Sequence, residues 1–166
     1  MMKQLKKIIH AILLDKKQIK MKISDNNYSL LVQQIVKHEG EEQYAYNDSR
    51  GYVTIGIGRN IDRRCENGLS KDEIYYLLNN DLRACIAKID SYIWYINSDE
   101  IRQGVLIELC FNMGLDNLLK FHDFLNFMQH KNYVGASQSL LDSAWSKEVQ
   151  KTRVDDIIAR LKNGIY

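Results

Sequence analysis

The feature that most constrains the fold is a change of hydrophobic period, from helix to strand and back to helix. Residues 29–39 repeat apolar side chains at helical spacing, and Gly40 is well placed to end that helix. Residues 44–58, YAYNDSRGYVTIGIG, instead join strand-favouring Tyr, Val, Thr and Ile to a turn rich in Asn, Asp and Gly. From Ser70 onward the period is helical again. This order predicts an α+β fold, with a small antiparallel hairpin sheet near the front and a mostly helical body behind it.

Local signals place the helix boundaries. Asn27 or Ser29 is expected to cap the first helix, and the capping box SKDE at residues 70–73 opens a long one. Ser98, Asp99 and Glu100 begin another helix, which Gly114 ends. Further helices are expected near residues 121–130, 133–144 and 151–162. The buried face of the long helix is expected to hold Ile74, Leu77, Leu78, Cys85, Ile86 and Ile89.

Charge is distributed unevenly along the 166 residues. Hydrophobic residues make up 45% of the chain and charged residues 27%, which suits a soluble globular protein. Residues 1–28 hold seven lysines and two aspartates, a formal charge of +5, whereas residues 29–166 hold 16 basic and 19 acidic groups. The main body is therefore mildly acidic, and nucleic-acid binding is not expected of it.

Residues 1–28 are interpreted as a basic amphipathic extension, and residues 29–166 as the main domain. The extension carries an apolar run from Ile8 to Leu14 that is flanked by lysine pairs. The run is at the short limit for a signal peptide, and no small-residue cleavage site follows it. Three roles stay open: a helix that packs on the domain or is partly disordered, weak contact with a membrane surface, or an export address.

The cysteines and histidines do not indicate a metal or a disulfide framework. Cys65, Cys85 and Cys110 are odd in number and widely spaced, and Cys85 and Cys110 fall on apolar helix faces, where they are expected to be core residues of a protein that folds in a reducing compartment. No metal is predicted, because the histidines do not cluster in the sequence; they are His10, His38, His122 and His130.

Two carboxyl groups on the helix-to-hairpin connection have the chemistry of a glycoside hydrolase. Such an enzyme needs one protonated acid to donate to the leaving oxygen and one ionised acid on the other side of the bond. Glu39, held against an apolar helix face, could stay protonated, and Asp48, in a polar turn, would stay ionised. Thr54 could hydrogen-bond a water molecule beside Asp48. From spacing alone, however, a solvated glutamate and an ordinary turn aspartate explain the pattern better than an enzyme site does.

The same residues resemble the active-site signature of the phage-type lysozymes (glycoside hydrolase family 24, the phage endolysins). The pattern E-x8-D-x5-T falls on Glu39, Asp48 and Thr54, and the strand GYVTIGIG follows Asp48 as it does in that family. FNMG at residues 111–114, SAW at 143–145 and the later TR that ends at Arg153 are also similar to family segments. The resemblance covers roughly residues 29–164 and leaves the extension unexplained.

The resemblance implies a role for each matched residue. Glu39 would be the general acid, and Asp48 would position or activate the attacking water with help from Thr54. Arg153 would pair with the catalytic glutamate. The substrate-binding residues that the resemblance implies are Phe111, Asn112, Ser139 and Asn60. It also implies hydrolysis of the β-1,4 bond between N-acetylmuramic acid and N-acetylglucosamine in peptidoglycan, without a cofactor and with inversion at the anomeric carbon.

Three positions depart from the family pattern. Arg59 stands where the family usually has a histidine that makes a structural ion pair. Ala144 replaces an arginine before the tryptophan, and Phe124 appears in place of a small polar cleft residue. The catalytic trio is intact, but these changes could alter glycan affinity.

Two functions from different classes remain for a chain of this kind. The first is a monomeric muramidase that lyses the cell wall, and the second is a weakly active or inactive peptidoglycan-binding module on the same fold. The protein would be made in the cytoplasm without a convincing signal peptide and would act on the wall after release or secretion. Three biological settings stay open. A phage lysin would need a holin route to the wall, and a secreted antibacterial toxin would need an immunity partner. The third setting is a prophage remnant.

Overall fold

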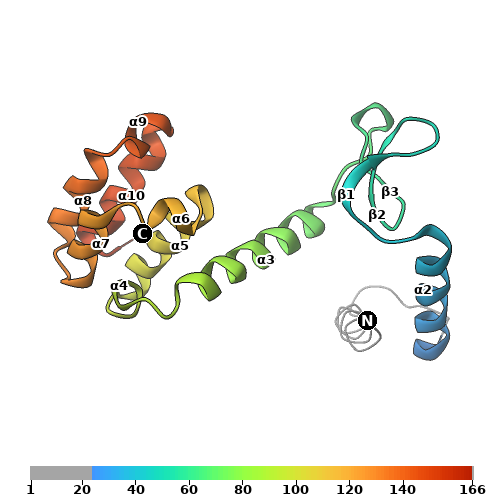
Figure 1. Ribbon diagram of the computed structural model, residues 1–166, viewed down its shortest axis with the longest axis horizontal. Coiled ribbons are helices and arrows are strands. Elements are labelled where there is room, and N and C mark those ends of the chain that lie inside the picture. The colour runs from blue at the N-terminus through green and yellow to red at the C-terminus, as the bar shows by residue number, and fades with distance from the viewer. Residues whose placement is uncertain (1–23, 166) are drawn as a thin grey trace. The chain divides into compact units, whose positions relative to one another are not determined.

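The computed structural model describes residues 24–165 and divides the chain into two compact units. The first unit ends at Ser70 and carries the sheet, and the second begins at Lys71 and is helical (Figure 1). This is the α+β architecture that the order of periods predicts, and it is consistent with the lysozyme-like fold that the resemblance implies. The extension at residues 1–28 lies almost wholly outside the described residues.

The first unit opens with helix α2, Asp25–Glu39. Its cap is Ser24, whose hydroxyl accepts a hydrogen bond from the Asn27 N–H at 3.3 Å, so the expectation of a cap at Asn27 or Ser29 was wrong. The sequence could not single out the cap, because residues 24–27 are four consecutive polar residues and each could have capped the helix. The helix therefore runs across the boundary expected between residues 28 and 29. Gly40 ends it with φ +80°, as predicted.

A three-stranded antiparallel sheet follows, in the order β1-β2-β3. The strands are β1, Glu42–Asn47, β2, Val53–Gly56, and the short β3, Arg59–Asn60. Thr54 lies at the centre, because it pairs with Tyr46 of β1 and with Asn60 of β3. A 3-10 turn, η1, Arg63–Cys65, comes next. The predicted hairpin is confirmed, and the third strand was not expected, since two residues are too few to show a period.

The second unit is a set of helices that begins with α3, Lys71–Ile89. The longer helices after it are α5, Glu100–Met113, α7, His122–Gln129, α8, Tyr133–Leu141, and α10, Lys151–Asn163. Three four-residue helices join them: α4, Ile93–Ile96, α6, Leu115–Leu118, and α9, Trp145–Glu148. The helices expected near residues 121–130, 133–144 and 151–162 are all present.

The core of the second unit is built mainly from α5, α7, α8 and α10, and its fully buried members include Leu106, Leu109, Phe124 and Leu140. Cys85 and Cys110 are buried free thiols in this core, as predicted. The expected buried face of α3 is only partly confirmed. Its C-terminal half buries Cys85 and Ile89, whereas the side chains near its start are exposed, so the same apolar spacing has different surroundings at its two ends.

Arg102 locks α5 to the end of α10. Its Nε donates to the Leu161 carbonyl at 2.8 Å and its Nη2 to the Lys162 carbonyl at 3.1 Å, which satisfies two carbonyls at the helix C-terminus. Asp99 accepts from Nη1 at 2.6 Å, and the guanidinium lies 3.7 Å from the centre of the Tyr133 ring. These contacts hold the two main core helices together.

Across residues 24–165, no helix combines the length and the apolar character that a bilayer span requires.

Candidate functional site

Glu39 lies where α2 meets the sheet. It is the last residue of the helix and is exposed, and a Cβ atom added at Gly58 would lie 3.4 Å from its Oε2. The turn between β2 and β3 therefore passes directly beside this carboxyl group, and glycine leaves room for it. The apolar enclosure expected around Glu39 is absent among the described residues of the first unit, because the last turn of α2 is exposed.

Asp48 lies in the turn between β1 and β2, and its carboxylate is held by backbone donors. Its Oδ1 accepts hydrogen bonds from the N–H groups of Arg50 at 2.8 Å and Tyr52 at 2.9 Å. The Arg50 guanidinium lies 3.6 Å from Oδ2. The Tyr52 N–H, followed by the N–H and side chain of Arg50, lowers the pKa of Asp48 despite partial desolvation. The ionised state expected of Asp48 is therefore favoured.

Thr54 is buried beside this turn, with 3% of its surface exposed. Its hydroxyl donates to the Tyr52 carbonyl at 3.1 Å, and the Asp48 N–H donates to the same carbonyl at 2.9 Å. In the structure this hydroxyl holds the peptide group that also holds Asp48. The water contact expected of Thr54 stays a prediction.

Sequence reasoning missed Asp62 and Arg64, which close the other side of the hairpin. Asp62 is 5% exposed, and its Oδ2 accepts from the Val53 N–H at 2.9 Å. Its carboxylate also binds Arg64 through Nε at 2.9 Å and Nη2 at 2.6 Å, and the hydrogen bonds from Arg64 are the main reason why the pKa of Asp62 is lowered. Asp62 also caps η1, and an aspartate before a short turn is the signal that could have found it.

Asn60 faces this network, and the substrate contact that the resemblance assigns to it stays a prediction. Its Oδ1 accepts from the Asp62 N–H at 2.9 Å, and its Nδ2 lies 3.8 Å from the Cys65 sulfur. Asn60 is half-buried, so its described contacts orient Asp62.

In the second unit, Phe111 and Asn112 occupy the last turn of α5. Phe111 is 47% exposed, as a residue that contacts a sugar would need to be. The Asn112 Oδ1 accepts a hydrogen bond at 2.8 Å from the Trp145 Nε1, and Trp145 is buried. Asn112 therefore anchors α9 to α5, and its amide nitrogen is the part that a ligand could still use.

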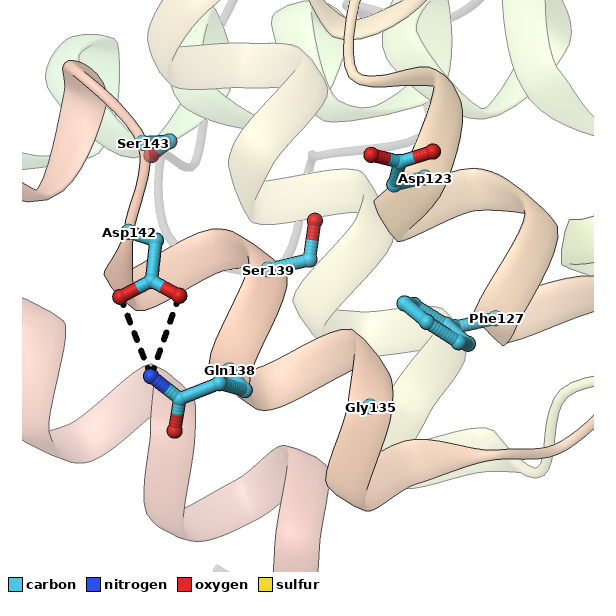
Figure 2. A pocket seen from close by; sticks show the side chains of 7 residues that line it. All are labelled: Asp123, Phe127, Gly135, Gln138, Ser139, Asp142 and Ser143. Carbon is cyan, nitrogen blue, oxygen red and sulfur yellow. Dashed lines mark hydrogen bonds between the residues drawn. The ribbon is translucent and has the colours of Figure 1, made fainter.

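Ser139 lines a hollow of about 660 Å³ between α7 and α8 (Figure 2). Gln138 and Asp142 form part of its wall, where the Gln138 Nε2 donates to both Asp142 oxygens, at 3.0 and 3.2 Å. Asp123 and Phe127 come from α7. The structure thus places Ser139 in a concave surface, where a substrate contact is sterically feasible.

The wall of this hollow depends on Gly135. A Cβ atom at this position would lie 2.9 Å from two atoms of the Phe127 ring and 2.8 Å from the Asn132 Nδ2. Gly135→Ala is therefore expected to lower the free energy of unfolding by about 1–3 kcal/mol through overpacking, as measured by denaturant unfolding. Gly68→Ala is the matched control, because nothing lies within 4 Å of its Cβ position. Equal stability of both variants would contradict the expectation.

Arg153, near the start of α10, contacts an acid that the sequence analysis did not consider. Its Nε lies 4.0 Å from the Glu108 Oε1, and Arg160 binds the other oxygen of Glu108 at 2.5 Å. Arg153 is about half exposed. The pairing of Arg153 with Glu39 stays a prediction, since the two residues belong to different units.

The three departures from the family pattern have different outcomes. Arg59 is exposed and donates through Nη2 to the Gly68 carbonyl at 3.0 Å. Ala144 is exposed at the start of α9. Phe124 is fully buried in the core, so the interpretation of it as a cleft residue was wrong. It lies on the inward side of α7, which alignment to a polar family position could not reveal.

The first unit has a small antiparallel sheet, with one carboxyl group at its helix junction and another in its first turn, and a helical unit follows it in the sequence. These features are those of a lysozyme-like α+β protein. The chain belongs to the phage lysozyme family, whose model matches residues 36–163. Two relatives from Dictyostelium discoideum, probable T4-type lysozyme 1 and probable T4-type lysozyme 2, are each 27% identical over 153 residues. Each alignment covers 76% of this chain and 89% of the relative.

Proposed function

We propose that this chain is a muramidase, which hydrolyses the β-1,4 bond between N-acetylmuramic acid and N-acetylglucosamine in bacterial peptidoglycan. The observation that carries the proposal is the ionised state of Asp48, which is favoured by two backbone N–H groups and by Arg50. The sheet that holds Asp48 also passes beside Glu39. Membership of the phage lysozyme family, together with the names of the two relatives, supports a lysozyme-like glycosidase role.

The proposed reaction divides the work between two acids. Glu39 donates its proton to the glycosidic oxygen as the bond to the anomeric carbon breaks. Asp48 takes a proton from a water molecule, and the water oxygen forms the new bond to the anomeric carbon from the opposite face. The products are a sugar with a free reducing end and a sugar with a free hydroxyl group, and the configuration at the anomeric carbon inverts. Thr54 assists by holding the Tyr52 peptide that orients Asp48.

The glycan would lie against both acids of the first unit. Phe111 and Ser139 are proposed to bind it, through an exposed ring and a hydroxyl in a hollow. Asn112 would contribute its amide nitrogen, and Arg153 would support Glu39. The enzyme would act as a monomer on glycan strands of the cell wall, with no cofactor, and residues 1–28 could add weak membrane contact.

The experiment is digestion of purified cell wall by the full chain. We expect turbidity to fall and new reducing ends to appear, and borohydride reduction followed by acid hydrolysis should convert muramic acid, not glucosamine, to its alcohol. Proton NMR of a soluble glycan oligomer should show the α anomer first, as inversion requires.

Other outcomes would change the assignment. Reduced glucosamine would indicate a glucosaminidase, and a β anomer formed first would indicate retention. Co-sedimentation with wall without any reducing ends would support the alternative, a peptidoglycan-binding or scaffolding module, and would overturn the proposal of catalysis.

A further inference from the structure

Two peptide groups, Gly51–Tyr52 and Tyr52–Val53, hold both residues of the hairpin to which the reaction assigns water activation. The first carries the Tyr52 N–H, which donates to Asp48 Oδ1 at 2.9 Å. The second carries the Tyr52 carbonyl, which accepts the Asp48 N–H at 2.9 Å and the Thr54 hydroxyl at 3.1 Å. A displacement of these two peptide groups would therefore move the Asp48 carboxylate and the Thr54 hydroxyl.

The peptide groups on either side of Tyr52 are held by one ion pair. The Gly51 carbonyl accepts a hydrogen bond from the Arg64 Nη2, and the Val53 N–H donates to the Asp62 Oδ2 at 2.9 Å. The Arg64 guanidinium also lies over the Tyr52 ring, 5.0 Å from its centre. Asp62 and Arg64 therefore contact Tyr52 and both of its neighbours.

The pair itself is rigid. Asp62 is buried and accepts from the backbone N–H of Arg64 at 2.8 Å, in addition to the two guanidinium contacts at 2.9 and 2.6 Å. Charge-assisted hydrogen bonds of this two-pronged kind fix orientation as well as distance. The Asn60 Oδ1 accepts the Asp62 N–H, so the aspartate is held at its own backbone too.

We propose that Asp62 and Arg64 are positioning residues, which fix the two peptide groups on either side of Tyr52 and so aim the Asp48 carboxylate at the attacking water. This inference rests on the proposed function, because it gives Asp48 the role of the base. An ion pair that only stabilised the turn could attach anywhere on the hairpin. This one binds the same two peptide groups that hold Asp48 and Thr54.

The test compares Arg64→Ala with Arg63→Ala in the full chain. The Arg63 side chain is exposed and has no hydrogen bond or ion pair with any other residue between 24 and 165. Its loss therefore removes the same charge but leaves in place the contacts of Asp62 and Arg64 with the two peptide groups beside Tyr52, which we call the clamp. On a soluble glycan oligomer, we expect Arg64→Ala to lower kcat by about tenfold to a hundredfold with little change in KM, because the carboxylate is misplaced and not removed. Arg63→Ala should leave both constants unchanged.

A pH measurement separates positioning from a general loss of stability. The charged group that faces Asp48 is Arg50, and the Tyr52 phenol lies under the Arg50 and Arg64 guanidinium groups. When the Tyr52 N–H is no longer aimed at Asp48, the pKa of Asp48 should rise, and the acid limb of the kcat/KM profile should move to higher pH. A merely structural role would lower activity at every pH and leave the limb in place.

Carbon NMR titration of the Asp48 carboxyl keeps the inference independent of activity. If the wild-type chain cleaved no glycan, the proposed function would fail, yet an upward pKa shift of Asp48 in Arg64→Ala would still support the clamp. An unshifted titration in a folded Arg64→Ala variant would overturn the clamp even if the enzyme were active. If Arg64→Ala unfolds, Arg64→Lys replaces it in the test, because lysine keeps the charge but lacks the planar guanidinium. We expect a smaller upward shift of the Asp48 pKa in Arg64→Lys. An unchanged Asp48 pKa in that variant would overturn the inference.

Discussion

Glu39→Gln is expected to lower kcat on wall glycan by about a thousandfold, the middle of the range for loss of a general acid. Glutamine has nearly the same shape but cannot donate a proton to the leaving oxygen. The position is exposed at the end of α2, so the substitution should not unfold the domain. Release of reducing ends from purified wall measures the activity, and thermal unfolding measures the stability.

An aryl glycoside of the same glycan sharpens the test. A good leaving group departs without a proton, so Glu39→Gln should retain most of its activity on that substrate. Glu41→Gln is the control, because Glu41 is exposed two residues further along the chain and should be silent on both substrates. Normal lysis by Glu39→Gln, or an equal loss on the two substrates, would show that Glu39 is not the acid.

Asp48→Asn is expected to reduce kcat by a comparable factor, about a hundredfold to ten thousandfold. The amide oxygen can still accept from the N–H groups of Arg50 and Tyr52, so the turn should keep its shape. The amide cannot take a proton from water, however, and that is the step the proposed reaction assigns to Asp48. Steady-state kinetics on a soluble oligomer would show the change in kcat.

The pH profile should confirm which state of Asp48 is active. Because the pKa of the wild-type carboxyl is lowered, its ionised form persists below the usual range of an aspartate, and kcat/KM should fall only at lower pH, where the group takes up a proton. The residual activity of Asp48→Asn should lack this acid limb. Asp155→Asn, on the exposed side of α10, is the control. An acid limb that persists in Asp48→Asn would assign it to another group.

The hairpin could be predicted from the sequence because its signals are local. The strand-favouring run after NDSRG and the glycines at positions 56 and 58 act within a few residues, and the structure has the strand, the turn and the positive φ angles there. The same holds for Gly40 and Gly114, which end α2 and α5. The placement of Glu39 beside the hairpin is consistent with the family pattern.

The clamp on Tyr52 could not be predicted in the same way. Asp62 reaches back nine residues to Val53, and Arg64 reaches thirteen residues back to Gly51, so neither contact has a periodic signature. Resemblance to a family gives a residue its place in the alignment but not the direction of its side chain. That is why Phe124 could be taken for a cleft residue when it belongs to the core.

The two buried thiols have a consequence for how the folded chain responds to oxidants. Cys85 and Cys110 are enclosed by the core, and burial, together with the adjacent Cys85, raises the pKa of Cys110 to about 11. Oxidants and disulfides react with the thiolate, which is scarce at neutral pH for Cys110. The Cys110 thiol of the folded chain should therefore resist oxidation and disulfide exchange.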